Sequence, residues 1–182
     1  RAVAEGALVA ADAVKAGAIL FVAALIQVTV LNRLEILGGG PDLLLLALVA
    51  VSLLRGSVFG AVGGFCAGLV VDTADLGTLG LTSLVLTVAG YWIGRYGETT
   101  GRDRVHAPFV SVAVVTVLAS FGELLLHFMI GDHVSARLVL LDALFPSILL
   151  NLVLTAPVYA LCRRLLRPPE LAELATEVRL LG

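Results

Sequence analysis

The chain is organised as six apolar runs, separated by short segments that carry charges, glycines or prolines. A membrane-spanning helix needs about 20 mostly apolar residues, and a charged or turn-forming residue marks where such a run stops. The pattern therefore predicts an all-α integral membrane protein with six transmembrane helices in a compact bundle. The predicted spans are Lys15–Leu31, Asp42–Leu54, Ser57–Val71, Leu79–Tyr96, Ala107–Ile130 and Val139–Leu166.

Only Arg55 and Gly56 separate the second run from the third, so the two are either one long tilted helix or two short ones. A charge in mid-membrane costs about 2.5–3.5 kcal/mol, which disfavours one helix with Arg55 at its centre. With six spans and the N-terminus inside, ten of the twelve basic residues are cytoplasmic, and only Arg33 and Arg137 lie outside. Cytoplasmic loops are enriched in Lys and Arg. We therefore expect both termini in the cytoplasm, and helices 2 and 3 as a short, tight hairpin.

Composition supports this class and excludes two others. The chain is 59% hydrophobic and 14% charged, against about 45–50% and about 25% in soluble domains. Such a chain is not disordered, and a net charge of −2 gives no basic patch for nucleic acid. Cys66 and Cys162 are expected to be small buried apolar residues. We expect one transmembrane domain over residues 1–167 and a short amphipathic cytoplasmic tail over residues 168–182.

The most specific local pattern is a glycine stripe in the third run. Glycine recurs every fourth residue there, at Gly56, Gly60, Gly64 and Gly68. Glycines at this spacing let two membrane helices approach closely. The pattern predicts a tight helix crossing, either with another helix of this chain or with the transmembrane helix of a partner.

Four polar residues are further candidates. Asp72 follows the stripe and either caps a turn or contacts a ligand or partner. Glu123 and His127 lie four residues apart, so they share one face of the fifth helix. Ionisable groups in membrane helices are costly and are functional candidates. We favour an internal hydrogen bond or ion pair here over a binding or proton-transfer role. Asn151 is expected to bond across helices or to a carbonyl freed by a nearby proline.

Motifs for catalysis and for metal binding are missing from the sequence. It contains no phosphate-binding loop and no Gly-x-Ser-x-Gly elbow. His106, His127 and His133 do not have the spacing of metal ligands. We therefore expect no enzyme activity, no cofactor and no metal.

Taken together, the motifs resemble a known family, the rod shape-determining protein MreD. The resemblance covers roughly Gln27 to Arg167. It rests on the order and spacing of the following residues: Pro41-Asp42, Arg55-Gly56, Gly60, Gly64-Phe65, Gly68-Leu69, Asp72, Leu79-Gly80-Leu81, Gly90-Tyr91, Gly94-Arg95, Glu123, Asn151-Leu152, Pro157-Val158-Tyr159 and Arg163-Arg164.

The resemblance implies a fold similar to the substrate-binding S components of energy-coupling-factor transporters. It also implies a non-catalytic role in bacterial cell elongation, in the cytoplasmic (inner) membrane. The implied direct partner is MreC, a bitopic protein. Through MreC the chain would act on the glycosyltransferase RodA, on its class B penicillin-binding transpeptidase and on MreB filaments. The alternative is a transporter subunit that captures a small molecule, as an S component does.

Overall fold

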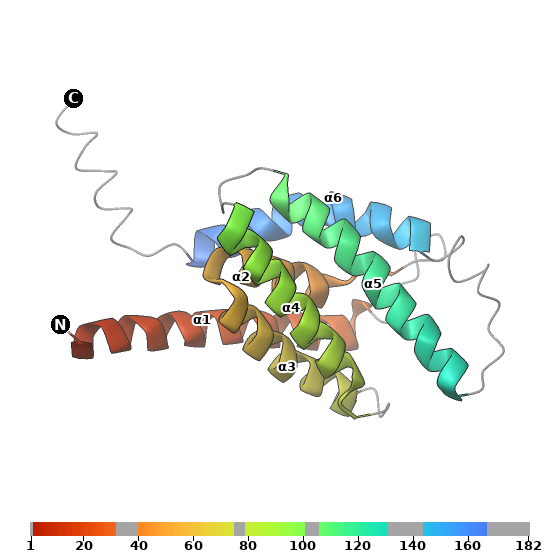
Figure 1. Cartoon of the computed structure of the whole chain (residues 1–182), viewed down its shortest axis with the longest axis horizontal. Coiled ribbons are helices and arrows are strands. Elements are labelled where there is room, and N and C mark those ends of the chain that lie inside the picture. The colour runs from red at the N-terminus through yellow and green to blue at the C-terminus, as the bar shows by residue number, and fades with distance from the viewer. Residues whose placement is uncertain (1, 32–39, 75–78, 101–105, 131–143, 167–182) are drawn as a thin grey trace.

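The described part of the chain consists of six helices and no strands (Figure 1). The computed structural model describes residues 2–31, 40–74, 79–100, 106–130 and 144–166. The helices are α1 (Ala2–Thr29), α2 (Leu43–Arg55), α3 (Ser57–Ala74), α4 (Leu81–Thr100), α5 (Ala107–Ile130) and α6 (Leu144–Leu166).

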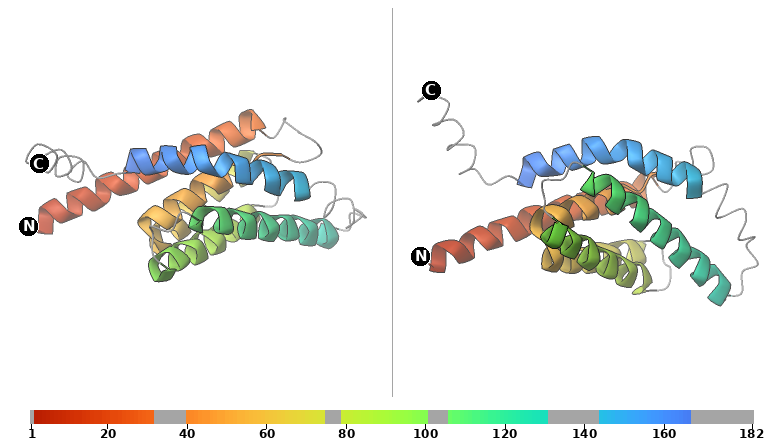
Figure 2. Two further views of the ribbon diagram at one scale, coloured as in Figure 1. Left: turned by 90° about the horizontal axis from the view of Figure 1, so that it is seen from above. Right: turned by 45° about the horizontal axis from the view of Figure 1, so that its top comes forward.

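The six helices fall on the six predicted runs, with clear differences at the start of α1 and at the end of α4, which continues to Thr100 beyond the predicted end at Tyr96. The helical class is confirmed, but α1 begins at Ala2, well before the predicted start at Lys15. Its N-terminal part projects beyond the other helices in every view (Figures 1 and 2). The proposed tail at residues 168–182 lies outside the described residues.

Three of the described helical segments are long and apolar enough to cross a membrane, namely Ala10–Thr29, Ser57–Ala74 and Leu144–Leu166. Two further apolar segments, Leu43–Arg55 and Ala107–Gly122, are shorter. The chain is therefore a membrane protein by composition and by three candidate spans. The six-span topology and the cytoplasmic placement of both termini stay predictions.

The short helix α2 lies at the centre of the molecule, and every residue from Leu44 to Leu53 is buried. A helix that is apolar around its whole circumference is buried on all sides. One face packs on α1 and α3 through Leu44, Leu48 and Val51. The opposite face packs on α4 and α5 through Leu45, Leu46, Val49 and Leu53. α2 also contacts α6, so five helices surround it.

α2 and α3 are joined by a single residue. α2 ends at Arg55 and α3 begins at Ser57, with only Gly56 between them. Gly56 has a φ of 99°, a conformation that favours glycine, and its N–H donates to the Ser52 carbonyl. This glycine reverses the chain within one residue and places α3 against the same central helix.

The glycine stripe packs on α4, a helix of the same chain. A Cβ added to Gly60 would lie 2.3 Å from the Gly90 carbonyl oxygen, and one added to Gly64 would lie 2.3 Å from that of Leu86. At Gly68 the added Cβ would lie 2.3 Å from Ser83 Cα. The contact is mutual, since a Cβ on Gly90 would meet the Gly60 oxygen at 2.2 Å. The two backbones touch because each contact has a glycine on α3, and at Gly60 and Gly90 neither helix carries a side chain.

The two cysteines differ in burial. Cys162 is buried as expected, whereas the expectation for Cys66 was wrong, because this residue is exposed. Gly64 and Gly68 turn toward α4, and Cys66 lies between them in sequence on a side of α3 that α4 does not cover.

We predict that Gly64→Ala destabilises the protein by at least about 1–3 kcal/mol, the usual cost of overpacking, because the new methyl group meets backbone atoms that cannot rotate away. Gly17→Ala in α1 is the matched control, since a Cβ there has nothing within 4 Å. Thermal unfolding of both variants in the same detergent measures the difference. Equal melting temperatures would contradict the packing described for α3 and α4.

Candidate functional site

The buried carboxylate Asp72 at the end of α3 caps the start of α4. It is only 4% exposed. One carboxylate oxygen accepts hydrogen bonds from the N–H groups of Gly80 (2.9 Å) and Ser83 (3.2 Å), and the other accepts from Thr82 (3.2 Å). The first N–H groups of a helix have no partner within the helix and favour a negative charge. Asp72 therefore ties the second helix of the α3–α4 pair to the end of the first.

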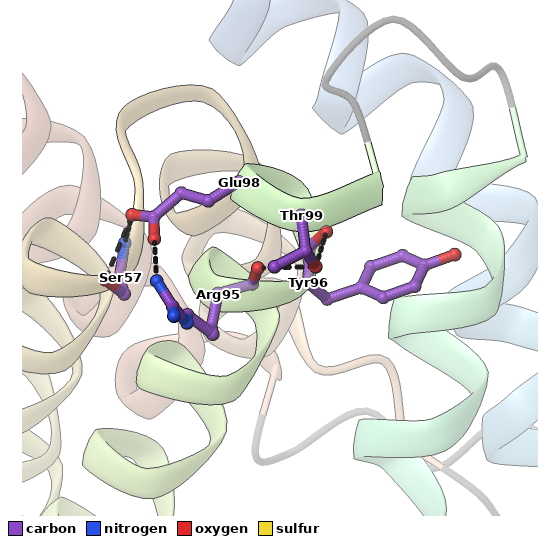
Figure 3. Close-up of polar contacts among 5 residues, drawn as sticks. All are labelled: Ser57, Arg95, Tyr96, Glu98 and Thr99. Atoms are coloured by element: carbon purple, nitrogen blue, oxygen red, sulfur yellow. Dashed lines mark hydrogen bonds and ion pairs between the residues drawn. The ribbon is translucent and has the colours of Figure 1, made fainter.

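Glu98, near the end of α4, makes the reciprocal contact with the start of α3. Its Oε1 accepts from the Ser57 N–H at 2.8 Å and from the Ser57 hydroxyl at 3.0 Å (Figure 3). Arg95 lies 3.5 Å from the other oxygen of Glu98 in an exposed pair. Each helix of this antiparallel pair thus supplies a carboxylate to the N-terminus of the other.

Glu98 lies beyond the predicted span that ends at Tyr96, and its surroundings lower its pKa. The backbone hydrogen bond from Ser57 is the largest cause, followed by that from the Ser57 hydroxyl. Both bonds favour the ionised carboxylate. The contact is therefore strongest when Glu98 is charged.

A second set of polar groups surrounds the start of α2. Asp42 caps α2 by accepting from the Leu45 N–H at 2.9 Å. The Asp42 N–H donates to Asn151 Oδ1 at 2.9 Å, and Asn151 Nδ2 donates to Thr116 Oγ1 at 3.2 Å. Gln27 of α1 accepts from the Leu43 N–H at 2.8 Å. This polar junction links α1, α2, α5 and α6 through satisfied hydrogen bonds.

A third polar contact lies at the other end of α2. Arg55 pairs with Asp12 of α1 through both terminal nitrogens, and the Nη2 to Oδ1 distance is 2.8 Å. The same Nη2 donates to the Leu166 carbonyl of α6 at 2.6 Å. The side chain of Arg55 is 14% exposed and that of Asp12 is 26% exposed. A bidentate arginine of this kind fixes orientation as well as supplying energy, so three helices are joined at one point.

The structure does not gather the predicted site residues in one place. Gly60, Gly64 and Gly68 are covered by α4, and Gly56 forms the turn before α3. Asp72 lies in the cap of α4, and Asn151 in the polar junction. Glu123 and His127 lie four residues apart on α5, but their side chains are outside the part that the structure describes.

Sequence reasoning missed several of the residues that make these contacts. Asp12, Gln27 and Glu98 were not singled out, because a polar residue near a span end has no partner that the sequence can identify. The α4 side of the glycine contact, in contrast, is visible in the sequence. Gly90 and Gly94 on α4 have the same four-residue spacing as the stripe, and Gly94 packs on Ser57.

Two apolar grooves lie on the surface of the described residues. One, of about 410 Å³, runs between α1 and α3, where Gly17 and Cys66 are part of its lining. The other, of about 510 Å³, runs between α4 and α5. Within the described ranges no group of three or more His, Cys, Asp or Glu side chains could hold a metal. Chemically, the described surface is suited to packing against apolar groups.

Comparison with known proteins identifies one family. The family described as rod shape-determining protein MreD matches residues 14–167, which is most of the chain. No curated protein and no solved structure matches this chain. The similarity to S components that the resemblance implies therefore stays a prediction.

We predict that Asn151→Leu destabilises the protein by about 1 kcal/mol, because it leaves the Asp42 N–H and the Thr116 hydroxyl without their partner. Thr155→Val is the matched control. Thr155 is equally buried one turn along α6, but among the described residues its hydroxyl bonds to the Asn151 carbonyl of its own helix and not to another helix. Thermal unfolding in detergent compares the two, and a control that is as damaging as Asn151→Leu would contradict the importance of the junction.

We predict that acid weakens the contact between Glu98 and Ser57. A carboxylate whose pKa is lowered on folding stabilises the folded state above its ordinary pKa of 4.5, and this stabilisation disappears as the pH falls through the lowered value. The melting temperature of Glu98→Gln should therefore lie below that of the wild type at pH 7. The two should converge as the pH falls below 4.5 and through the lowered pKa of Glu98. A difference that is constant across this pH range would contradict a role for the charge.

Proposed function

The chain belongs to the MreD family of rod shape-determining proteins, and from this premise we propose that it is a non-catalytic membrane subunit of the machinery for bacterial cell elongation. The family match over residues 14–167 is the observation that carries the proposal. In this role the chain binds MreC and supports peptidoglycan synthesis and the maintenance of cell shape.

The described polar side chains support a role in assembly. Asp72, Glu98 and Asn151 are used to join helices of the same chain. Both grooves are lined mostly by apolar side chains, which suit lipid or another helix better than a water-soluble molecule. For this reason we favour the subunit of the elongation machinery over a transporter subunit that captures a small molecule.

We further propose six spans in the inner membrane, with both termini in the cytoplasm. The distribution of charge supports this orientation. Arg95 lies close to Glu98, near the start of α3. Arg163 and Arg164 lie within the last turn of α6, which ends at Leu166, and the Leu166 carbonyl accepts a hydrogen bond from Arg55. These basic residues gather at the end of the molecule where α2 meets α3, which we call the Arg55 end. A basic end is expected on the cytoplasmic side.

The proposed mechanism has no chemical step. The compact core of α2, α3 and α4 is a rigid support for MreC within the membrane. MreC in turn contacts RodA, its class B penicillin-binding transpeptidase and MreB. Membrane lipid surrounds the remaining surface.

We predict that MreC is recovered with the tagged chain after extraction from native membranes in mild detergent. An unrelated multi-pass membrane protein with the same tag is the control, and mass spectrometry identifies the partners. Recovery of MreC with wall-synthesis enzymes supports the proposal. Recovery of ATPases with a transmembrane energising subunit, and without MreC, would overturn it in favour of a transporter.

A further inference from the structure

The ring of helices around α2 has a loose seam between α4 and α5. α1, α3, α4, α5 and α6 all contact α2, but α4 and α5 touch each other far less than α3 and α4 do. The groove of about 510 Å³ lies along this seam. The buried or half-buried side chains at its floor include the small residues Ala89, Ser111 and Ala119 together with Ile93 and Val115.

The walls of this groove are two rows of exposed apolar side chains. On α4 the row repeats every four residues, at Leu84, Val88, Trp92 and Tyr96. On α5 the same spacing gives Val110, Val114 and Leu118. The row on α4 extends for about 18 Å at 1.5 Å per residue, more than half of a hydrocarbon core of about 30 Å. About half or more of the surface of each of these residues is exposed, except for Tyr96.

This shape is better suited to a helix than to a lipid chain. Helices pack when the side-chain ridges of one, spaced four residues apart, enter the grooves of another. Here two such ridges flank a lower floor of buried side chains, several of them small, so a third helix would pack on α4 and α5 at once. A lipid chain has no periodic ridges to fit between them.

The aromatic side chains at one end of the groove favour an occupant with a positive charge there. Trp92 and Tyr96 lie toward the C-terminal end of α4, the Arg55 end of the molecule, and Trp92 is 65% exposed. Figure 3 shows the Tyr96 ring turned away from Glu98 and Arg95. A cation near an aromatic face is attracted to the ring. The cytoplasmic flank of a single-span protein carries Lys and Arg, which would meet these two rings.

We propose that the groove between α4 and α5 is the docking site for the transmembrane helix of a single-span partner, with the basic flank of that helix against Trp92 and Tyr96. This inference rests on the proposed function, in which the partner is the bitopic protein MreC. It adds the location, the helix faces involved and the orientation of the bound helix.

The experiment fills the groove from each wall. Val88→Trp and Val114→Trp place a large ring where the partner helix would lie, at positions that are 49% and 52% exposed. Val153→Trp on α6, at a position that is 66% exposed and outside both grooves, is the matched control. Each variant is expressed with MreC and purified, and elution volume and melting temperature verify its folding. We expect MreC recovery to fall at least about tenfold for the two groove variants and to be unchanged for the control.

A second measurement does not depend on the folding of the tryptophan variants. The photo-crosslinking amino acid p-benzoylphenylalanine replaces Val114, or Val153 as control, and whole membranes are irradiated. We expect an adduct with MreC from the Val114 position only. An adduct with phospholipid alone would overturn the proposal in favour of a lipid site.

The outcomes separate this inference from the proposed function. Folded groove variants that recover as much MreC as the wild type overturn the docking site and leave the proposed function intact. A wild-type chain that recovers no MreC overturns both.

Discussion

The close approach of α3 and α4 is the constraint on which the rest of the structure depends. Gly60 and Gly90 have no side chains where the two helices meet, so backbone touches backbone. In a membrane there is no hydrophobic driving force between helices, so their association depends on close van der Waals packing and on hydrogen bonds. The contact also sets the register of the pair, and this register brings Asp72 to the start of α4 and Glu98 to the start of α3.

The polar contacts hold the remaining helices around this pair. An unpaired polar group costs several kcal/mol in an apolar medium, and the described buried side-chain nitrogen and oxygen atoms all have partners. Asn151 joins α2, α5 and α6 near the start of α2, and Arg55 joins α1, α2 and α6 at its end. Because α2 is tied at both ends and buried between them, the core is a rigid unit.

The separation of inward polar contacts from an outward apolar surface suits a protein that works by binding other membrane proteins. The polar residues described here serve the inside of the chain, whereas the outward surface along α4 and α5 is apolar and grooved. A scaffold needs a surface that keeps its shape when the partner is absent, because ordering on binding costs affinity. The α3–α4 pair provides such a surface, since α4, which forms one wall of the groove, packs tightly on α3.

The sequence by itself determined the helical class, the membrane environment and the family, because apolar runs, glycine spacing and basic residues are local signals. It also predicted a tight helix crossing at the glycine stripe, and it singled out Asp72 as a turn cap or a ligand or partner contact and Asn151 for a bond across helices or to a freed carbonyl. Only the tertiary structure decided that α4 covers the stripe, that Asp72 caps α4, and that Asp12 is the partner of Arg55. The partners of a side chain are not marked in the sequence, whether they lie 8 residues away, as for Asp72 and Gly80, or 43 residues away, as for Asp12 and Arg55. A membrane helix with a glycine face can likewise pack on any neighbour of suitable shape. Which neighbour it meets depends on how all the helices fill the space around α2.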